Sequence, residues 1–170
     1  RAIELTQDPM SEAELHEVSG MMAVVRLDVE PAIEHFRQAI SIYAELVKAH
    51  PEDAAIRTAL ARVHNQIGSA LEDWGDLSGA LENERRALAL LEELHAASPG
   101  DVAIRRSLSV TYDYIARSLF LNGEFAAALE NNGRGLELRA ALASEDPTNA
   151  MFRRMLAVSY QMDGDIRDQS

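Results

Sequence analysis

Hydrophobic residues recur along most of this chain at the three- and four-residue spacing of an amphipathic helix. One segment carries them at Ile56, Leu60, Val63, Ile67 and Leu71, and the next carries them at Leu77, Leu81, Leu88, Leu91 and Leu94. This spacing places each set on one face of a helix. Along the whole chain the pattern predicts helices at residues 12–26, 29–49, 53–74, 77–97, 101–122, 125–145 and 149–167.

The helical pattern is itself repeated every 48 residues. Pro51, Pro99 and Pro147 are spaced by this period, and residues 51–98 match residues 99–146 at 17 of 48 positions without a gap. Unrelated stretches of similar composition would share about three to five positions. A repeat of this length encodes one supersecondary unit, and here the hydrophobic pattern makes that unit a pair of helices.

The prolines divide the chain into units of this kind. We expect a single array over residues 1–170, and the first unit is shorter because Pro9 precedes Pro51 by only 42 residues. The expected divisions are 1–8 as the end of a preceding helix, 9–50, 51–98 and 99–146 as three repeats, and 147–170 as the first helix of a truncated fourth.

A short polar residue stands where the first helix of each unit is expected to begin. These residues are Ser11, Asp53, Asp101 and Asn149. Their side-chain oxygens can accept hydrogen bonds from the free N–H groups of the first turn, so each is predicted to be an N-cap. Ser11 together with Glu14 also fits a capping box.

Composition and charge narrow the class of protein. Apolar residues make up 47% of the chain and aromatic residues only 5%, which favours helices over sheets. The net charge of −12 argues against nucleic acid and acidic membrane surfaces as partners. The absence of cysteine excludes disulfides and thiolate metal sites. No apolar run approaches the roughly 20 residues of a membrane span, and no signal-peptide pattern is present, so we expect a cytoplasmic location.

The units resemble the tetratricopeptide repeat. Its leucine-glycine pair falls on Ile67-Gly68, its inner turn on Gly75-Asp76-Leu77, and its small residues on Ala80 and Ala87. The period of 48 rather than 34 makes each helix about two turns longer. The stretch DPTNAMFRRMLAVSY at 146–160 also resembles the long-unit arrays found beside bacterial serine/threonine kinase and other signalling domains. The resemblance implies an all-α fold, an α-α superhelix (a solenoid) of antiparallel helical hairpins.

The resemblance also implies a protein–protein interaction scaffold within a larger signalling or regulatory protein. A peptide or partner domain would lie in the concave groove lined by the first helices. The candidate groove contacts are Arg62, Asn65, Ser69, Arg106, Asp113, Arg117, Phe120 and Arg154. The arginines among them would anchor an acidic side chain or a C-terminal carboxylate, because guanidinium binds carboxylates bidentately. The alternative for these arginines is a solvated helix face with ion pairs between units.

A second interpretation of the whole chain is a structural spacer, or a segment that self-associates through exposed terminal helices, next to a catalytic domain such as a kinase. Enzyme activity, a metal ion and a cofactor are not expected. The histidines form no HExxH motif, and His16 and His64 occupy equivalent repeat positions, which favours packing over metal ligation. The stretch NGRG at 132–135 lacks the Gly-Lys-Ser/Thr sequence of a phosphate-binding loop. We further expect Trp74 to be a buried plug, with an exposed contact residue as the alternative. We expect Arg105 to be structural and to pair with a cap or a neighbouring helix.

Overall fold

The computed structural model describes residues 8–169. The helices are α1 (Pro9–Val25), α2 (Val29–Ala49), α3 (Ala54–Asp73), α4 (Leu77–Ala97), α5 (Val102–Leu121), α6 (Phe125–Glu145) and α7 (Ala150–Gln169). Each corresponds to one helix predicted from the hydrophobic pattern, which confirms the all-α class. The largest difference is at α1, which begins at Pro9 instead of residue 12. The helix end predicted at residues 1–8 lies outside the described residues except for Asp8.

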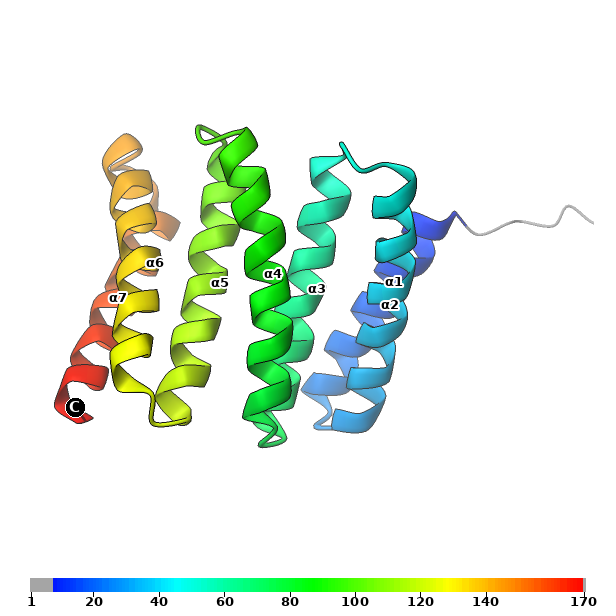
Figure 1. The fold of residues 1–170 in the computed structure, drawn as a ribbon, viewed down its shortest axis with the longest axis horizontal. Coiled ribbons are helices and arrows are strands. Elements are labelled where there is room, and N and C mark those ends of the chain that lie inside the picture. The colour runs from blue at the N-terminus through cyan, green and yellow to red at the C-terminus, as the bar shows by residue number, and fades with distance from the viewer. Residues whose placement is uncertain (1–7, 170) are drawn as a thin grey trace, which may run out of the picture.

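The helices form antiparallel hairpins that stand side by side in a row, with the two ends of the chain at opposite ends of the row (Figure 1). α1 packs on α2, α3 on α4 and α5 on α6, and each hairpin contacts the next through α2–α3, α4–α5 and α6–α7. The first helix α3 also contacts α1 and α5. This arrangement buries the apolar stripe of each hairpin against its neighbour, as a solenoid requires.

The predicted N-caps are confirmed in three units. Asp53 Oδ1 accepts hydrogen bonds from the backbone N–H groups of Ala55 and Ile56 at 2.8 and 3.2 Å. Asp101 makes the equivalent bonds at the start of α5, and Asn149 accepts from the N–H of Met151 at 3.1 Å at the start of α7. These side chains satisfy N–H groups that the first helical turn leaves free.

The prediction of Ser11 as an N-cap is wrong. The cap of α1 is Asp8, whose carboxylate accepts from the N–H of Ser11 at 3.3 Å. Pro9 then occupies the first helical position, where its fixed φ suits the helix and its missing N–H has no cost. The helix therefore starts one turn earlier than a capping box at Ser11 would place it.

The inner turn of every hairpin has a left-handed residue at the same repeat position. Gly75 and Gly123 have φ of 87° and 78°, and Leu27 takes the same place in the first hairpin with φ 64°. In each turn the following N–H closes a Schellman motif, with Asp28 N bonded to Ala23 O at 2.9 Å and Asp76 N to Leu71 O at 2.8 Å. The 48-residue register therefore holds between α1 and α3 although the first unit is shorter.

Small residues let the two helices of a hairpin approach closely. A Cβ atom added at Gly68 would lie 2.9 Å from Cγ of Glu84 and 3.3 Å from the carbonyl oxygen of Ala80. Gly20 faces Phe36 in the same way, and Phe36 is 48 residues before Glu84. The second hairpin thus buries a carboxylic acid where the first buries an aromatic ring.

Two expectations for single side chains have opposite outcomes. Trp74 is not buried: it caps the C-terminal end of α3 and is 55% exposed. It lies in the inner turn between α3 and α4. Arg105 does form a structural ion pair, with Glu145 at the end of α6 at 2.6 Å. Arg57, at the same repeat position of the preceding unit, pairs with Glu93 of α4, which lies one turn before the position equivalent to Glu145. Within the described residues no helix is long and apolar enough to cross a membrane.

Candidate functional site

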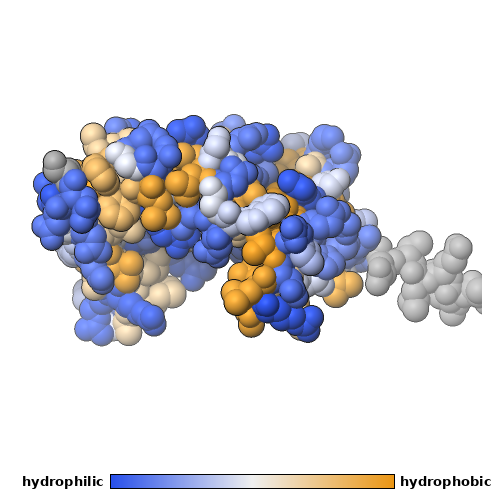
Figure 2. Space-filling view, turned by 90° about the horizontal axis from the view of Figure 1, so that it is seen from below, coloured by the Kyte–Doolittle hydropathy of each residue, from blue (hydrophilic) through white to orange (hydrophobic). Residues whose placement is uncertain are grey.

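A groove runs over the first helices on the side away from the second helices. It holds a cavity of about 730 Å³ lined mainly by α3, α5 and α7, and a smaller cavity of about 300 Å³ lies between α5 and α7. Figure 2 shows this side as a hollow between a lobe at the C-terminal end and a lobe near α1. The elements that form the groove are the ones that the resemblance assigned to it.

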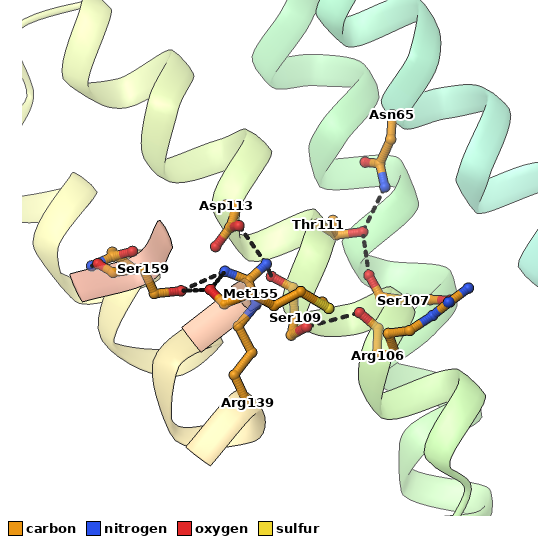
Figure 3. A network of polar contacts seen from close by, with 10 residues as sticks. Asn65, Arg106, Ser107, Ser109, Thr111, Asp113, Arg139, Met155 and Ser159 are labelled. Atoms are coloured by element: carbon orange, nitrogen blue, oxygen red, sulfur yellow. Dashed lines mark hydrogen bonds and ion pairs between the residues drawn. The ribbon is translucent and has the colours of Figure 1, made fainter. Parts of the chain in front are cut away.

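The floor of the groove contains a buried arginine from a second helix. Arg139 of α6 is only 2% exposed and forms a salt bridge with Asp113 of α5 (Figure 3). Its guanidinium also donates to the hydroxyl of Ser159 and, at 3.3 Å each, to the carbonyl oxygens of Met155 and Ser109. A buried guanidinium needs such partners because desolvation of an unpaired charge is costly.

Burial also affects the acid of this pair. Desolvation raises the pKa of Asp113, and the positive charges of Arg139 and Arg117 oppose that shift. Arg139 and Asp113 stand 48 residues after Leu91 and Asn65. The third hairpin therefore places a charged pair where the second has an apolar side chain and an amide.

A second part of the floor is uncharged. Asn65 of α3 donates to Thr111 of α5 at 2.7 Å, and Thr111 donates to the carbonyl oxygen of Ser107 at 3.2 Å (Figure 3). Asn65 Oδ1, Gln66 Oε1, Asp113 Oδ1 and Arg139 Nε are buried and have no hydrogen-bond partner within the described part of the chain. Buried polar atoms in native proteins are nearly always bonded to protein or water. These atoms are enclosed by the protein, so the uncharged part of the floor contains buried polar atoms that are only partly satisfied.

The structure brings most of the predicted contact residues to the groove. The larger cavity is lined by Arg62, Asn65, Arg106, Asp113 and Arg154, and the smaller one by Arg117 and, again, Asp113. Ser69 lines neither cavity and accepts a hydrogen bond from Arg117 at 3.2 Å. Phe120 packs against Phe125, with ring centroids 5.7 Å apart, and also lies away from both cavities.

The predicted cations differ in their ion pairing. Arg62 forms a salt bridge with the buried Glu17 of α1, and Arg117 pairs with Glu72 of α3 at 2.8 Å. Arg106 and Arg154 form no salt bridge within residues 8–169, and the Arg106 guanidinium donates a hydrogen bond to the sulfur of Met151 at 3.6 Å. In the described part of the chain, Arg106 and Arg154 are therefore the arginines of the larger cavity whose charge is not paired with a carboxylate.

Sequence reasoning missed Arg139 because it searched only the first helices. A signal was present, since Arg139 stands 48 residues after Leu91, within the apolar stripe of a second helix. A charged residue at a stripe position is informative because such residues are almost never fully buried unless they are paired. The predicted contacts also lacked Met151 and Met155, which together with Val158 give α7 an apolar lining in the groove.

Three of the five histidines contact another side chain through a ring nitrogen, and His50 is exposed. His16 and His35 face each other with their Nδ1 atoms 3.2 Å apart, and His64 Nδ1 lies 3.0 Å from Oδ1 of Asn83. Burial lowers the pKa of His64, which favours its neutral form. Among the described residues there is no group of three or more side chains that could hold a metal ion.

Comparison with known proteins gives matches at the level of structure. No protein-family model and no curated protein sequence matches the chain. The TPR2B domain of yeast Sti1, solved in complex with pHsp70, aligns with a TM-score of 0.60 and 18% identity over 94% of this chain and 99% of that domain. A kinesin light chain from Podospora anserina with TPR-like repeats aligns with a TM-score of 0.64 and 20% identity over 96% and 72% of the two chains.

A further match is the apo form of RapI, with a TM-score of 0.69 and 13% identity. The alignment covers 97% of this chain but only 45% of RapI, so the chain spans less than half of that protein. At these identities the likeness concerns the fold, and the fold agrees with the repeat pattern of the sequence. In fold, the chain is a tetratricopeptide-like repeat protein.

Proposed function

We propose that the chain is a protein-interaction scaffold whose groove binds an extended peptide segment through a carboxylate, either an acidic side chain or a free C-terminus. The observation that carries this proposal is the pair Arg106 and Arg154, which line the same cavity and have no salt bridge in the described part of the chain. In a chain of net charge −12, unpaired cations in a groove favour a negatively charged ligand.

The rest of the lining supports a peptide in particular. Asn65 and Gln66 line the same cavity, and side-chain amides can donate to and accept from a peptide backbone. Met151, Met155 and Val158 provide apolar contact for side chains, and methionine adapts to varied shapes. The TPR2B domain of Sti1, which shares the fold, was solved with pHsp70 bound.

We further propose that the array is part of a larger signalling or regulatory protein, as the long-unit resemblance suggests. The second candidate is a structural spacer or a self-association segment beside a catalytic domain. It is favoured by the exposed apolar residues of α1. The two candidates differ in one respect that can be measured: only the first requires a ligand in the groove.

The test is a screen of the chain against a fluorescent peptide library in which every sequence is made with a free C-terminal carboxylate and as the C-terminal amide. For a bound peptide, we expect Arg106→Ala and Arg154→Ala each to weaken binding by about 10-fold or more, because each removes a charge-assisted hydrogen bond. The matched control is Arg86→Ala, which removes an exposed arginine on α4 that pairs with Glu82 outside the groove.

Several outcomes would decide the question. Weaker binding of both groove variants, unchanged binding of Arg86→Ala, and affinity that falls with added salt would support the proposal. A preference for the carboxylate over the amide would identify the C-terminus as the anchor, and no preference would identify an acidic side chain. Peptides that bind all three variants equally, or a library without any ligand, would favour the spacer.

A further inference from the structure

A buried carboxylic acid is connected to the groove by a short chain of polar contacts. Glu84 of α4 is completely buried, and its Oε2 atom has no hydrogen-bond partner in the described part of the chain. Its Oε1 atom lies 3.0 Å from the hydroxyl oxygen of Ser118 on α5. The same hydroxyl oxygen lies 3.1 Å from Oε2 of Glu72 on α3, so one serine of α5 stands between two carboxyl groups of the preceding hairpin.

The chain of contacts ends at a cation of the groove. Arg117 of α5 lines the smaller cavity, and its Nε lies 2.8 and 3.0 Å from the two carboxylate oxygens of Glu72. The Arg117 side chain is 39% exposed. Its guanidinium also lies 5.2 Å from the ring centroid of Tyr114, which lines both cavities. Glu84 is thus linked through Ser118 and Glu72 to the charge that the smaller cavity presents.

The two contacts of Ser118 require a proton on one of the acids. A hydroxyl group has a single proton, so it can donate to only one carboxylate at a time. Glu72 is paired with Arg117, whereas Glu84 forms no salt bridge within residues 8–169. A proton on Oε1 of Glu84 satisfies both contacts, because Glu84 then donates to Ser118 and the serine donates to Glu72. Burial favours the same state, since desolvation raises the pKa of Glu84 to about 7.

The surroundings of Glu84 determine what its ionisation does. The titratable and charged groups that face it from the packed helices and from its own helix are Glu72 of α3, Arg117 and Tyr114 of α5, and Arg85 of α4. Ionised Glu84 is a buried carboxylate that needs a donor, so the Ser118 hydroxyl turns towards it. Glu72 then loses that donor, and the cluster around Arg117 becomes more negative by one charge. The smaller cavity attracts anions less strongly in this state.

The acid at this position is not a requirement of the fold. The residues 48 positions before and after Glu84 are Phe36 and Asn132, and both are buried. Neither residue at the same offsets from Ser118 has a hydroxyl group. The other hairpins therefore fill this place with an aromatic ring or an amide, without a titratable group. The carboxyl group occurs only where its contacts lead to an arginine of the groove.

We propose that Glu84 and Ser118 form a proton-dependent switch that regulates Arg117 and, with it, the affinity of the groove for a negatively charged ligand. While Glu84 is protonated, Ser118 donates to Glu72 and shares its negative charge with Arg117. When Glu84 releases its proton to solvent, Ser118 donates to Glu84 instead. Glu72 then binds Arg117 without a second donor. The effect on a ligand rests on the proposed function, whereas the switch is a property of the chain itself.

The first test needs no ligand. NMR follows the side-chain carboxyl carbon of Glu84 and the Nε–H group of Arg117 in the isotope-labelled full chain between pH 5 and pH 9. We expect both signals to titrate together, near the pKa of about 7 that burial gives Glu84. Glu84→Gln should abolish the response of Arg117, because the amide donates to Ser118 at every pH. The matched control is Glu82→Gln, which removes an exposed carboxylate of α4 that pairs with Arg86 and should leave both signals unchanged.

The NMR titration can overturn the switch in three ways. The Arg117 signal could be independent of pH, or it could change as much in Glu84→Gln as in the unaltered chain. A second variant, Ser118→Ala, leaves the acid in place and removes the hydroxyl group. Glu84 should still titrate in it, and the response of Arg117 should fall by at least about half. An undiminished response would overturn the role of the hydroxyl group.

The second test measures the regulation of binding. The fluorescent peptide library with free C-terminal carboxylates is titrated with the chain at pH 6 and at pH 8. We expect the peptides that bind to do so about 5-fold more tightly at pH 6, and Glu84→Gln to remove this difference. The same pH dependence in both proteins would overturn the regulation and leave the proposed function intact. A library without any ligand would count against the proposed function, and the NMR titration would still decide the switch.

Discussion

Arg139 of α6 and Asp113 of α5 form a buried salt bridge at the positions where the preceding hairpin has Leu91 and Asn65. The two hairpins thus build the same place in the fold in two ways, one charged and one largely apolar. In the apolar version Asn65 donates to Thr111, and the residue 48 positions after Thr111 is Ser159. This correspondence suggests how the charged pair can be replaced.

We expect Arg139→Leu alone to destabilise the chain by about 3–5 kcal/mol, because it leaves the Asp113 carboxyl buried without its cation. The double variant Arg139→Leu, Asp113→Asn should recover most of that loss, because an asparagine at 113 can donate to Ser159 as Asn65 does to Thr111. Urea unfolding of the two variants and the unaltered chain measures both effects. A double variant no more stable than the single one would show that the two hairpins are not interchangeable here.

The second prediction concerns the pH dependence of stability. Glu84 is completely buried, and desolvation raises its pKa to about 7 from an ordinary value of 4.5, while its bond from Ser118 opposes the shift. The folded state therefore holds this proton more tightly than the unfolded state. Below pH 4.5 Glu84 is protonated in both states and does not affect the pH dependence of stability. As the pH rises from 4.5 to about 7, the unfolded state releases this proton and the folded state retains it, so the free energy of unfolding falls by about 3 kcal/mol in total.

Glu84→Gln tests this assignment, because glutamine has nearly the same shape and does not ionise. We expect the variant to be more stable than the unaltered chain at pH 7.5 and the difference to shrink at pH 5. Urea unfolding at both pH values measures the difference in the free energy of unfolding between the two proteins. The contributions of the other titrating groups are common to both proteins and cancel in this difference. A difference that is the same at both pH values would mean that Glu84 does not titrate in this range.

The third prediction concerns the left-handed residue of the first hairpin. Leu27 has φ 64° and is almost fully exposed, so its side chain gains little from packing while its backbone conformation is costly for a residue with a Cβ. Leu27→Gly should raise the free energy of unfolding by about 1 kcal/mol, since Gly75 and Gly123 occupy the same position in the other hairpins.

The reverse change is the control for Leu27. Gly75→Ala should lower stability by about 1 kcal/mol, and no atom lies within 4 Å of the added Cβ, so the effect comes from the backbone alone. Thermal or urea unfolding of both variants gives the comparison. Shifts of the same sign in the two variants would contradict the role of φ in these turns.

The fourth prediction separates a packing glycine from a glycine that merely weakens a helix. Gly68→Ala would bring a methyl group within 2.9 Å of Glu84 and 3.3 Å of the Ala80 carbonyl, so we expect a loss of about 1–3 kcal/mol. Gly133→Ala, in the interior of α6 with nothing within 4 Å, should add about 1 kcal/mol. Two variants that change stability equally would argue that neighbouring atoms do not decide the outcome at Gly68.

Sequence and structure contribute different parts of this picture. The helices, their caps at Asp53, Asp101 and Asn149, and the 48-residue period could be predicted from the sequence, because a helix is encoded by local spacing and local hydrogen bonds. The start of α1 was misplaced because Asp8 and Pro9 compete with Ser11 for the same function, and only the folded helix shows which of them caps it.

The electrostatics of the groove were decided by the tertiary structure. Arg62, Arg106, Arg117 and Arg154 are similar in the sequence, yet Arg62 meets Glu17 and Arg117 meets Glu72, each 45 residues away on the preceding first helix. Such pairs depend on how far each hairpin is rotated against the next, and the hydrophobic pattern of a single helix carries no information about that rotation. The sequence by itself determined the helices, their order and the 48-residue register, and the stacking of the hairpins determined which cations of the first helices lack a salt bridge.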